Sequence, residues 1–274
     1  MTTEELIAAR RAEPWREALR KSKKNKERTD IPRVEMNELD AEYRSHTRLE
    51  EVNLGLTKEQ AMQEAQRCLD CPNPTCMQGC PVSINIPTFV KNIERGEFLE
   101  AARVLKETSA LPAVCGRVCP QEKQCESKCI HLKMGKPAVA IGYLERFAAD
   151  YERESGNISI PEVAEKNGIK IAVVGSGPAG LSFAGDMAKR GYDVTVFEAL
   201  HEIGGVLKYG IPEFRLPNKI VDVEIEGLRK MGVKFMTNCI VGKTISYDDL
   251  HADGFKGIFA ASGAGLPNFM NIPG

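Results

Sequence analysis

Long apolar runs, a secretory signal and a strong net charge are all missing from this sequence of 274 residues. No stretch approaches the ~18 consecutive apolar residues that a membrane-spanning helix needs. The N-terminus, MTTEELIAAR, is charged and has no apolar signal core. The formal net charge of −1 gives no overall attraction to nucleic acid or to an anionic membrane. We therefore expect a cytoplasmic protein with no nucleic-acid or membrane partner.

Most of the chain also lacks cysteine, because eight of the nine cysteines lie between Cys68 and Cys129 and Cys239 stands alone. Clustered cysteines form disulfides mainly in small secreted domains. This chain is large and has no signal, so metal binding is the better interpretation. We expect Cys239 to be a core residue. No arrangement of Ser, His and Asp suggests an acid, base or nucleophile, so we assign no catalytic residue.

The spacing of the clustered cysteines indicates which metal centre they hold. The two groups are Cys68-x2-Cys71-x4-Cys76-x3-Cys80-Pro81 and Cys115-x3-Cys119-Pro120-x4-Cys125-x3-Cys129. Structural zinc usually takes two C-x2-C-like pairs, whereas here there is one such pair and too many thiols for one zinc ion. Iron–sulfur clusters need about four thiolates each, and a cysteine followed by proline is typical of two-cluster ferredoxins. We therefore predict two [4Fe–4S] clusters, with zinc as the alternative.

Helices and cysteine loops account for the chain up to about residue 151, where we expect no strand. Thr57 and Gln60 form a capping box that starts a helix leading to Cys68. A second helix is expected after Pro87, with an inner face of Phe89, Val90, Ile93, Phe98, Ala102 and Leu105. The charged run RKSKKNKER at 20–28 is typical of a solvated helix face, and a basic patch for a partner is the alternative.

The pattern changes after residue 168 to that of a β-α-β unit. Two β-branched runs, IKIAVVG and YDVTVFE, flank a helix-like stretch from Pro178 to Arg190, which predicts a parallel sheet. Gly175, Gly177 and Gly180 form G-x-G-x-x-G between the first strand and the helix. Glu198 ends the second strand, where a carboxylate accepts hydrogen bonds from ribose hydroxyls. Together these features predict a dinucleotide site.

The segments CLDCPNPTCMQGCPVSINIP, LPAVCGRVCPQEKQCESKC and AIGYLERFAADY resemble the N-terminal helical iron–sulfur domain of the glutamate synthase small (β) subunit family. The same domain begins dihydropyrimidine dehydrogenase and the large subunit of NADH-dependent ferredoxin:NADP oxidoreductase. The resemblance implies interleaved ligand sets, which are Cys68, Cys71, Cys76 and Cys129 for one cluster and Cys80, Cys119, Cys125 and Glu145 for the other. Spacing alone favours a solvated helix residue at Glu145. Cys115 is expected to be a buried, unligated thiol, and His131 a surface residue.

The stretch EALHEIGGVLKYGIPEFRLP resembles the FAD-binding half of the same family, in which a glycine pair, here Gly204 and Gly205, lets the backbone approach the cofactor. The resemblance implies further FAD-lining residues, which are Ser176, Pro178, Ala179, Leu200 through Val206, Arg215 and Val241, with the backbone of Val118 contributed by the cluster domain. The alternative for Arg215 is a helix-cap or surface charge.

The fold we expect is an all-helical two-cluster domain over residues 1–155, with a role for 1–50 left open. A linker at 156–168 and a partial Rossmann-like FAD-binding domain at 169–274 follow. In the family an NAD(P)-binding domain interrupts the FAD domain, and no second G-x-G-x-x-G occurs here. NADPH is therefore expected to bind only with that missing domain.

The resemblance implies an oxidoreductase subunit that passes electrons from NAD(P)H through FAD and two clusters to a partner. For glutamate synthase the partner is a large subunit with FMN and amidotransferase chemistry. Two alternatives remain, namely the ferredoxin:NADP oxidoreductase large subunit with a ferredoxin-type electron partner, and a non-catalytic electron-relay or docking fragment. An oligomer is compatible with the sequence.

Overall fold

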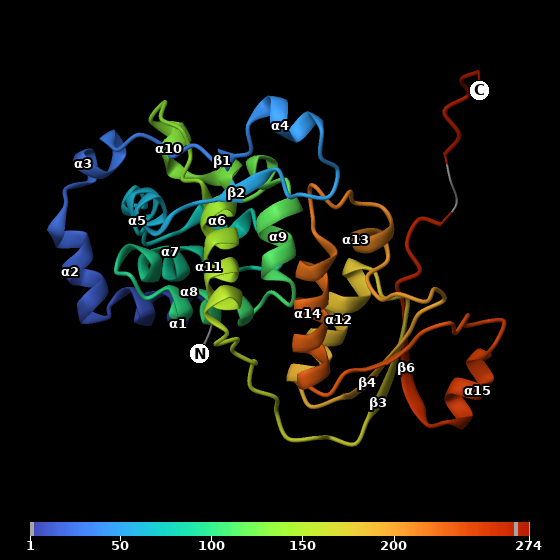
Figure 1. Ribbon diagram of the computed structural model, residues 1–274. Helices are drawn as coiled ribbons and strands as arrows, with labels where there is room; N and C mark the ends of the chain where they lie inside the picture. Colours follow the sequence, from blue (N-terminus) through green and yellow to red (C-terminus); the bar gives the residue numbers. More distant parts are fainter. Residues whose placement is uncertain (1–2, 266–267, 274) are drawn as a thin grey trace. The chain divides into compact units, whose positions relative to one another are not determined.

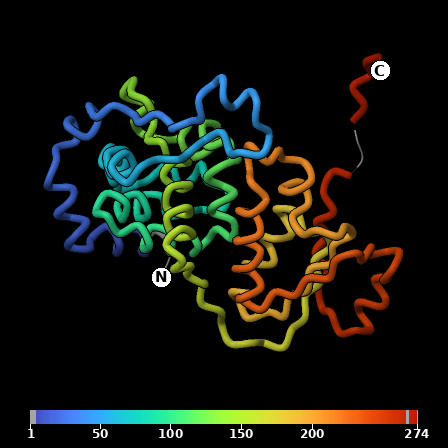
Figure 2. The backbone as a smooth tube through the Cα atoms, in the orientation of Figure 1, coloured from blue at the N-terminus to red at the C-terminus, as the bar shows by residue number. Residues whose placement is uncertain are grey.

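The computed structural model describes residues 3–265 and 268–273, which form two compact units (Figures 1 and 2). The first unit comprises the described part of Met1–Pro161 together with Pro212–Glu224. The second comprises Glu162–Ile211 and the described part of Ile225–Gly274. Residues 212–224 thus belong to the first unit, although they lie within the range that the sequence predicts to be the FAD domain. Residues 157–169 form neither helix nor strand.

The first unit is mainly helical. Its helices are α1 (Thr3–Arg11), α2 (Pro14–Ser22), α3 (Asn25–Asp30), α4 (Ala41–Ser45), α5 (Lys58–Gln66), α6 (Thr75–Gln78), α7 (Ile86–Glu94), α8 (Phe98–Lys106), α9 (Pro112–Val118), α10 (Ile130–Lys133) and α11 (Ile141–Ser155), with short 3₁₀ turns η1 (Gln121–Lys123) and η2 (Glu126–Lys128). The predicted capping box at Thr57 is confirmed, since its side chain accepts from the Gln60 backbone and Gln60 reaches back to the Thr57 N–H.

The longest helix of this unit, α11, packs against α5, α7, α8 and α9. Figure 1 shows it running through the middle of the helical unit. An aromatic cluster joins α8 to α11, with the ring centroids of Phe98 and Phe147 5.0 Å apart and those of Phe98 and Tyr151 4.9 Å apart. The core of the unit therefore lies around α11, next to the cysteine loops.

Two details of the predicted helical domain are wrong. The unit contains two short antiparallel strands, β1 (Asn37–Glu38) and β2 (Asn53–Gly55), which are too short to show an alternating apolar pattern. The single helix expected after Pro87 is two helices, α7 and α8, because the chain turns at Gly96 with φ +85°. All six residues of the predicted inner face are nevertheless buried.

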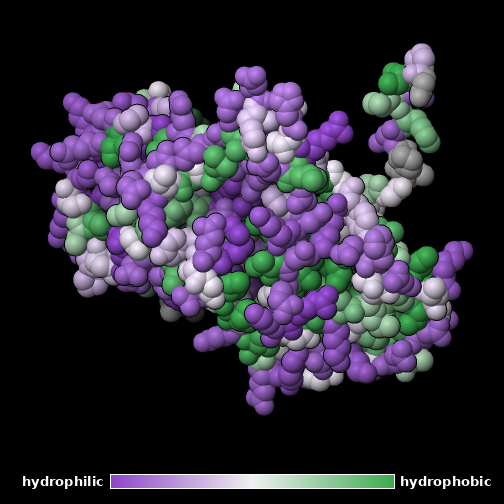
Figure 3. Space-filling view, in the orientation of Figure 1, coloured by the Kyte–Doolittle hydropathy of each residue, from purple (hydrophilic) through white to green (hydrophobic). Residues whose placement is uncertain are grey.

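The charged run at 20–28 is only partly solvated. Lys21, Lys24 and Lys26 are exposed as predicted. Arg28 is buried, and its guanidinium lies 2.9 Å from the Glu94 carboxylate. Hydrophilic residues predominate over the helical unit on the face that Figure 3 shows. No helix within residues 3–265 and 268–273 is long and apolar enough to cross a membrane.

The second unit is built on a parallel sheet, as predicted. Its strands are β3 (Lys170–Val174), β4 (Asp193–Phe197), β5 (Lys234–Met236) and β6 (Phe255–Ala260), in the order β5-β4-β3-β6. Its helices are α12 (Pro178–Lys189), α13 (Val206–Tyr209) and α15 (Tyr247–Ala252), and α14 (Asn218–Lys230) has residues in both units. The strand order reverses at β3, and ligands of open parallel sheets bind at such a switch point, outside the carboxyl ends of the strands.

Candidate cofactor sites

Four cysteines line one apolar cavity in the first unit, namely the neighbouring Cys68, Cys71 and Cys76 and the distant Cys129. Cys68 follows α5, Cys76 lies in α6 and Cys129 precedes α10. The other lining residues are mostly apolar and are Leu69, Pro74, Thr75, Ile86, Pro87, Val90, Ile130, His131, Val139 and Ile141. The structure thus brings together the whole ligand set that the family resemblance implies for the first cluster.

The chemistry of this cavity suits a cationic centre. Burial raises the pKa of the Cys68 thiol to about 11 and raises the pKa of Cys76 well above its usual value, with neighbouring thiols adding to the effect at Cys76. Burial and the nearby Cys129 also raise the pKa of Cys71. Thiolates packed this closely repel one another unless a metal supplies positive charge. The donor set therefore fits a thiolate-bound metal cluster.

Within residues 3–265 and 268–273, no three His, Cys, Asp or Glu side chains are grouped so that they could hold a single metal ion. A single tetrahedral ion requires its ligands to converge on one point. In a four-iron cluster each thiolate binds a different iron, so the sulfurs surround the cluster instead. The ring of cysteines around a cavity is compatible with that second arrangement.

The second predicted ligand set also gathers in the first unit. Burial raises the pKa of Cys119 to about 11, with further contributions from the charges of Glu145 and Cys80. Burial likewise raises the pKa of Cys125, with contributions from Glu126, Glu145, Cys80 and Cys119. These mutual effects require the groups to be close. The sets alternate along the chain, since Cys76 and Cys80 flank the end of α6 but belong to different groups.

Glu145 is not a solvated helix residue, so that alternative is wrong. Its side chain lies on the buried face of α11, and its Oε1 has no hydrogen-bond partner. Burial, with a smaller contribution from Glu224, raises its pKa to about 8. A buried carboxyl oxygen without a partner is costly. An unpartnered carboxylate oxygen near Cys119 and Cys125 fits the role of a metal ligand.

Two other side chains near the cysteines differ from or extend the prediction. His131 is fully buried, with its Nε2 3.0 Å from the carbonyl oxygen of Arg67, so its predicted surface position is wrong. The burial of His131 depends on contacts with distant residues such as Arg67, which its neighbours in the sequence do not indicate. Cys115 is half-buried and lies near Glu145, Cys119 and Ser109, and burial raises its pKa.

The glycine loop of the second unit has the geometry that the motif predicts. Gly175 has φ +100°, and a Cβ there would lie 2.4 Å from the Ala261 carbonyl oxygen. A Cβ on Gly180 would lie 2.0 Å from the Gly175 carbonyl oxygen, so only glycine lets α12 pack this closely against the loop. A Cβ on Gly177 would meet nothing within 4 Å and would enter the cavity beside it. That open approach is what a cofactor phosphate would use.

This cavity gathers most of the predicted FAD residues of the second unit. Those that line it are Gly175, Ser176, Gly177, Pro178, Ala179, Glu198, Leu200, Gly205, Val206 and Val241. Gly180 lies beneath the loop, and the Gly204 N–H donates to Ser176 Oγ at 3.0 Å. His201, Glu202, Ile203 and Gly204 are not among the lining residues. Gly205 has φ +53°, a conformation that favours glycine.

Glu198 ties the walls of the cavity together. Its Oε2 accepts from the Ser176 N–H at 2.8 Å and from the Ser176 hydroxyl, while its Oε1 accepts from the Leu200 N–H at 2.9 Å. Each carboxylate oxygen can accept further bonds. The carboxylate therefore fixes the glycine loop and keeps acceptor capacity for a ligand hydroxyl.

Several lining residues were not predicted, namely Val174, Phe197, Ala199, Cys239, Ile240 and residues 260–264. Residues 261–264 follow β6, whose place beside β3 depends on a long-range pairing. Cys239 is only half-buried, but it packs against a core cluster that includes Phe197 and Leu250, in line with its predicted place in the core. Val118 and Arg215 belong to the first unit, and Arg215 is exposed. Their roles toward FAD stay predictions.

Two protein-family models match successive parts of the chain. Residues 44–157 match the family described as dihydropyrimidine dehydrogenase domain II, 4Fe-4S cluster, and residues 173–231 match the NAD(P)-binding Rossmann-like domain. The first range includes all eight clustered cysteines and Glu145.

Curated relatives are oxidoreductase subunits. The NAD-dependent dihydropyrimidine dehydrogenase subunit PreT of Escherichia coli O157:H7 is 39% identical over 224 residues, which are 81% of this chain and 54% of that protein. The glutamate synthase [NADPH] small chain of Escherichia coli (strain K12) is 39% identical over 205 residues, which are 74% of this chain and 43% of that protein. The corresponding small chain of Azospirillum brasilense is 33% identical over 224 residues, covering 82% and 46%. The chain spans about half the length of these relatives.

Proposed function

We propose that this chain, a homologue of glutamate synthase small chains and of PreT subunits, is the electron-transferring part of an NAD(P)H-dependent oxidoreductase. It would hold two [4Fe–4S] clusters in its first unit and FAD in its second, and deliver electrons to a partner subunit. The observation that carries the proposal is the cavity ringed by Cys68, Cys71, Cys76 and Cys129. Its agreement with the 4Fe-4S family match supports iron–sulfur over zinc.

Each ligand set would work through side chains that the fold already holds in place. Cys68, Cys71, Cys76 and Cys129 would bind the first cluster. Cys80, Cys119 and Cys125 would bind the second with Glu145, whose unpartnered buried oxygen supports this role. Bound flavin would accept two electrons together and release them one at a time, and the clusters would carry them singly, which is chemistry that side chains alone do not supply.

The second unit would bind the dinucleotide at the carboxyl end of β3. Gly177, Pro178 and Ala179 at the start of α12 line the cavity, and this helix N-terminus would hold the pyrophosphate, since it favours negative charge. Glu198 would accept from a ribose hydroxyl. Gly205 and Val206 line the same cavity and would approach the cofactor through their backbone, which favours FAD, as the resemblance implies.

The proposal also concerns the identity of the partner subunit. A glutamate synthase large subunit is one candidate, and a dihydropyrimidine dehydrogenase catalytic subunit is favoured equally by identity, since the PreT and small-chain relatives are both 39% identical.

Anaerobic co-purification of the complete protein from its native cells, followed by mixing with NADPH or NADH, tests the proposal. We expect bleaching of the flavin and cluster absorbance and transfer of electrons to the co-purified subunit. An amidotransferase partner would select the glutamate synthase role, and a pyrimidine-reducing partner the other. A complex that contains flavin and clusters but is not reduced by either nucleotide would contradict the proposal.

A further inference from the structure

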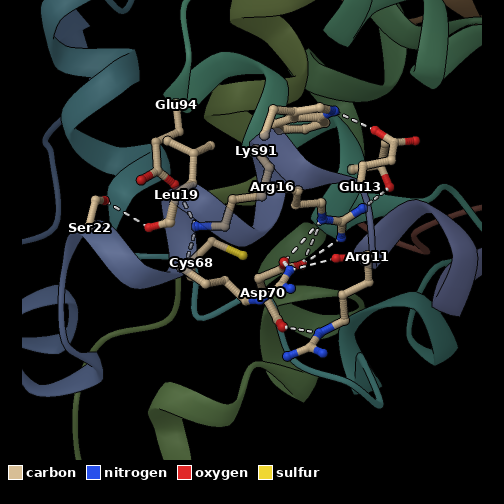
Figure 4. Close-up of polar contacts among 12 residues, drawn as sticks. Arg11, Glu13, Arg16, Leu19, Ser22, Cys68, Asp70, Lys91 and Glu94 are labelled. Carbon is tan, nitrogen blue, oxygen red and sulfur yellow. Dashed lines mark hydrogen bonds and ion pairs between the residues drawn. The ribbon is translucent and has the colours of Figure 1, made fainter.

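Side chains from the N-terminal helices form hydrogen bonds and ion pairs with the short loop between Cys68 and Cys71. Asp70 lies in this loop, is fully buried and has φ +51°, which is uncommon for a residue other than glycine. Arg16 Nε lies 3.0 Å from each Asp70 carboxylate oxygen, and Arg16 Nη2 lies 2.5 Å from Oδ1. Figure 4 shows the two side chains facing each other. A planar guanidinium with several bonds to one carboxylate fixes orientation as well as distance.

Two further arginines form hydrogen bonds with Asp70. Arg20 Nη1 donates to the Asp70 carboxylate at 2.7 Å, and Arg11 Nε donates to the Asp70 carbonyl oxygen at 2.9 Å. Arg16 also donates to Thr88 Oγ1 at 2.8 Å, which ties α2 to α7. Thus α1 and α2 hold both the side chain and the backbone of the loop that carries two predicted cluster ligands.

The other end of the loop is held by a second set of charges. Lys91 is fully buried, and its Nζ donates to the Cys68 carbonyl oxygen at 2.6 Å and pairs with Glu94 at 2.5 Å (Figure 4). Arg28 from α3 pairs with the same carboxylate group at 2.9 Å and donates to the Gln66 carbonyl oxygen at 2.7 Å. The backbone on both sides of Cys68 is therefore bonded to buried cations.

The charges around this loop do not cancel. The fully buried cations that hold the loop are Arg16, Arg28 and Lys91, whereas Arg11 and Arg20 are partly exposed. These three cations share two buried carboxylates, those of Asp70 and Glu94. Lys91 and Arg28 share the single carboxylate of Glu94. Burying uncompensated cations is costly. The excess of positive charge is accounted for by an anionic group in the adjacent cavity, and thiolates bound to iron are such a group.

Resting on the proposed function, we propose that α1 and α2 are part of the first cluster site. Arg16 and Arg20 act as positioning residues that fix the Cys68–Cys71 loop through Asp70 and raise the reduction potential of the cluster bound there. The physical reason is that reduction adds a negative charge, which nearby cations in a poorly solvated interior stabilise. The N-terminal extension, whose role the sequence left open, thereby acquires one.

The test is a redox titration of the anaerobically purified holoprotein, in which electron paramagnetic resonance gives the midpoint potential of each cluster. Arg16→Gln removes one charge and keeps donors, whereas Arg16→Lys keeps the charge but loses the planar fork. Lys21→Gln is the matched control, because Lys21 lies on the same helix, pairs only with Glu17 among the ion pairs and is 75% exposed. Arg20→Gln serves as a second variant if Arg16→Gln does not fold.

We expect Arg16→Gln and Arg20→Gln to lower the potential of one cluster and to leave the other unchanged. Arg16→Lys should keep a near-native potential but lose the iron of that cluster to a chelator faster than the wild type. Lys21→Gln should match the wild type in both measurements.

Potentials in Arg16→Gln and Arg20→Gln equal to those of Lys21→Gln, or equal shifts of both clusters, would overturn the inference. If the wild-type protein still contained two clusters in that experiment, the proposed function would be unaffected. A wild type without iron would overturn both.

Discussion

Gly177 and Gly180 of the second unit are only three residues apart, but the same substitution should have different effects at the two positions. Alanine at Gly180 should lower stability, and alanine at Gly177 should weaken FAD binding. In Gly180→Ala the new Cβ would lie 2.0 Å from the Gly175 carbonyl oxygen, well inside the 3.4 Å at which ordinary contact begins. The loop or α12 must therefore shift by more than 1 Å, by the difference of these two distances. Overpacking of this kind typically costs about 1–3 kcal/mol of unfolding free energy, and backbone against backbone gives the upper end.

Gly177→Ala should cost no more than about 1 kcal/mol of unfolding free energy, because Gly177 is the N-cap of α12 and alanine is the poorer cap. Its φ of −67° suits alanine, and its new Cβ would meet nothing within 4 Å. The methyl group would instead enter the cavity where the cofactor phosphates are proposed to lie. We expect FAD to bind about tenfold more weakly or worse, which corresponds to a loss of about 1.4 kcal/mol or more.

Thermal unfolding of the FAD-free protein and titration with FAD, followed by flavin fluorescence, separate the two effects. Gly227→Ala is the control, because its Cβ also meets nothing within 4 Å and Gly227 does not line the cavity. It should change neither affinity nor stability by more than about 1 kcal/mol. If Gly177→Ala bound FAD as tightly as Gly227→Ala does, the proposed path of the phosphates would be refuted.

Four further predictions concern the cluster ligands and the dinucleotide site. Cys71→Ser should reduce iron content by about half while the second cluster remains, whereas loss of both clusters would contradict separate ligand sets. Glu145→Gln should change the spectrum or potential of one cluster alone, and two unchanged signals would exclude ligation. In the iron-free chain, burial raises the pKa of Glu145 to about 8, so the folded state binds more protons than the unfolded state between about pH 4.5 and pH 8. The free energy of unfolding, measured with urea, should therefore fall as the pH rises through this range. The fall should be less steep in Glu145→Gln. Glu198→Gln should weaken FAD binding and loosen the glycine loop, because an amide nitrogen replaces one acceptor of the Ser176 and Leu200 bonds.

Local signals predicted much of the architecture. The capping box at Thr57 and the two strands around the glycine motif depend on neighbouring residues, so short windows of sequence contain them. The same holds for the glycines, whose role follows from the tight turn between strand and helix.

The parts that could not be predicted depend on contacts between distant segments. Arg16 and Asp70 are 54 residues apart, and a charged run such as that around Arg28 has the composition of a solvated helix even where it is buried. Residues 260–264 complete the dinucleotide cavity only because β6 pairs with β3. The burial of Glu145 likewise depends on the packing of α11 against α9. The neighbouring Arg146 is of a type usually found at the surface, so the local sequence does not indicate this burial.

Iron and acid-labile sulfide per chain, measured on anaerobically purified protein, test the central claim most directly. Two [4Fe–4S] clusters predict close to eight iron atoms and about eight sulfides, by the composition of the cluster. Stoichiometric zinc with negligible sulfide would contradict the account.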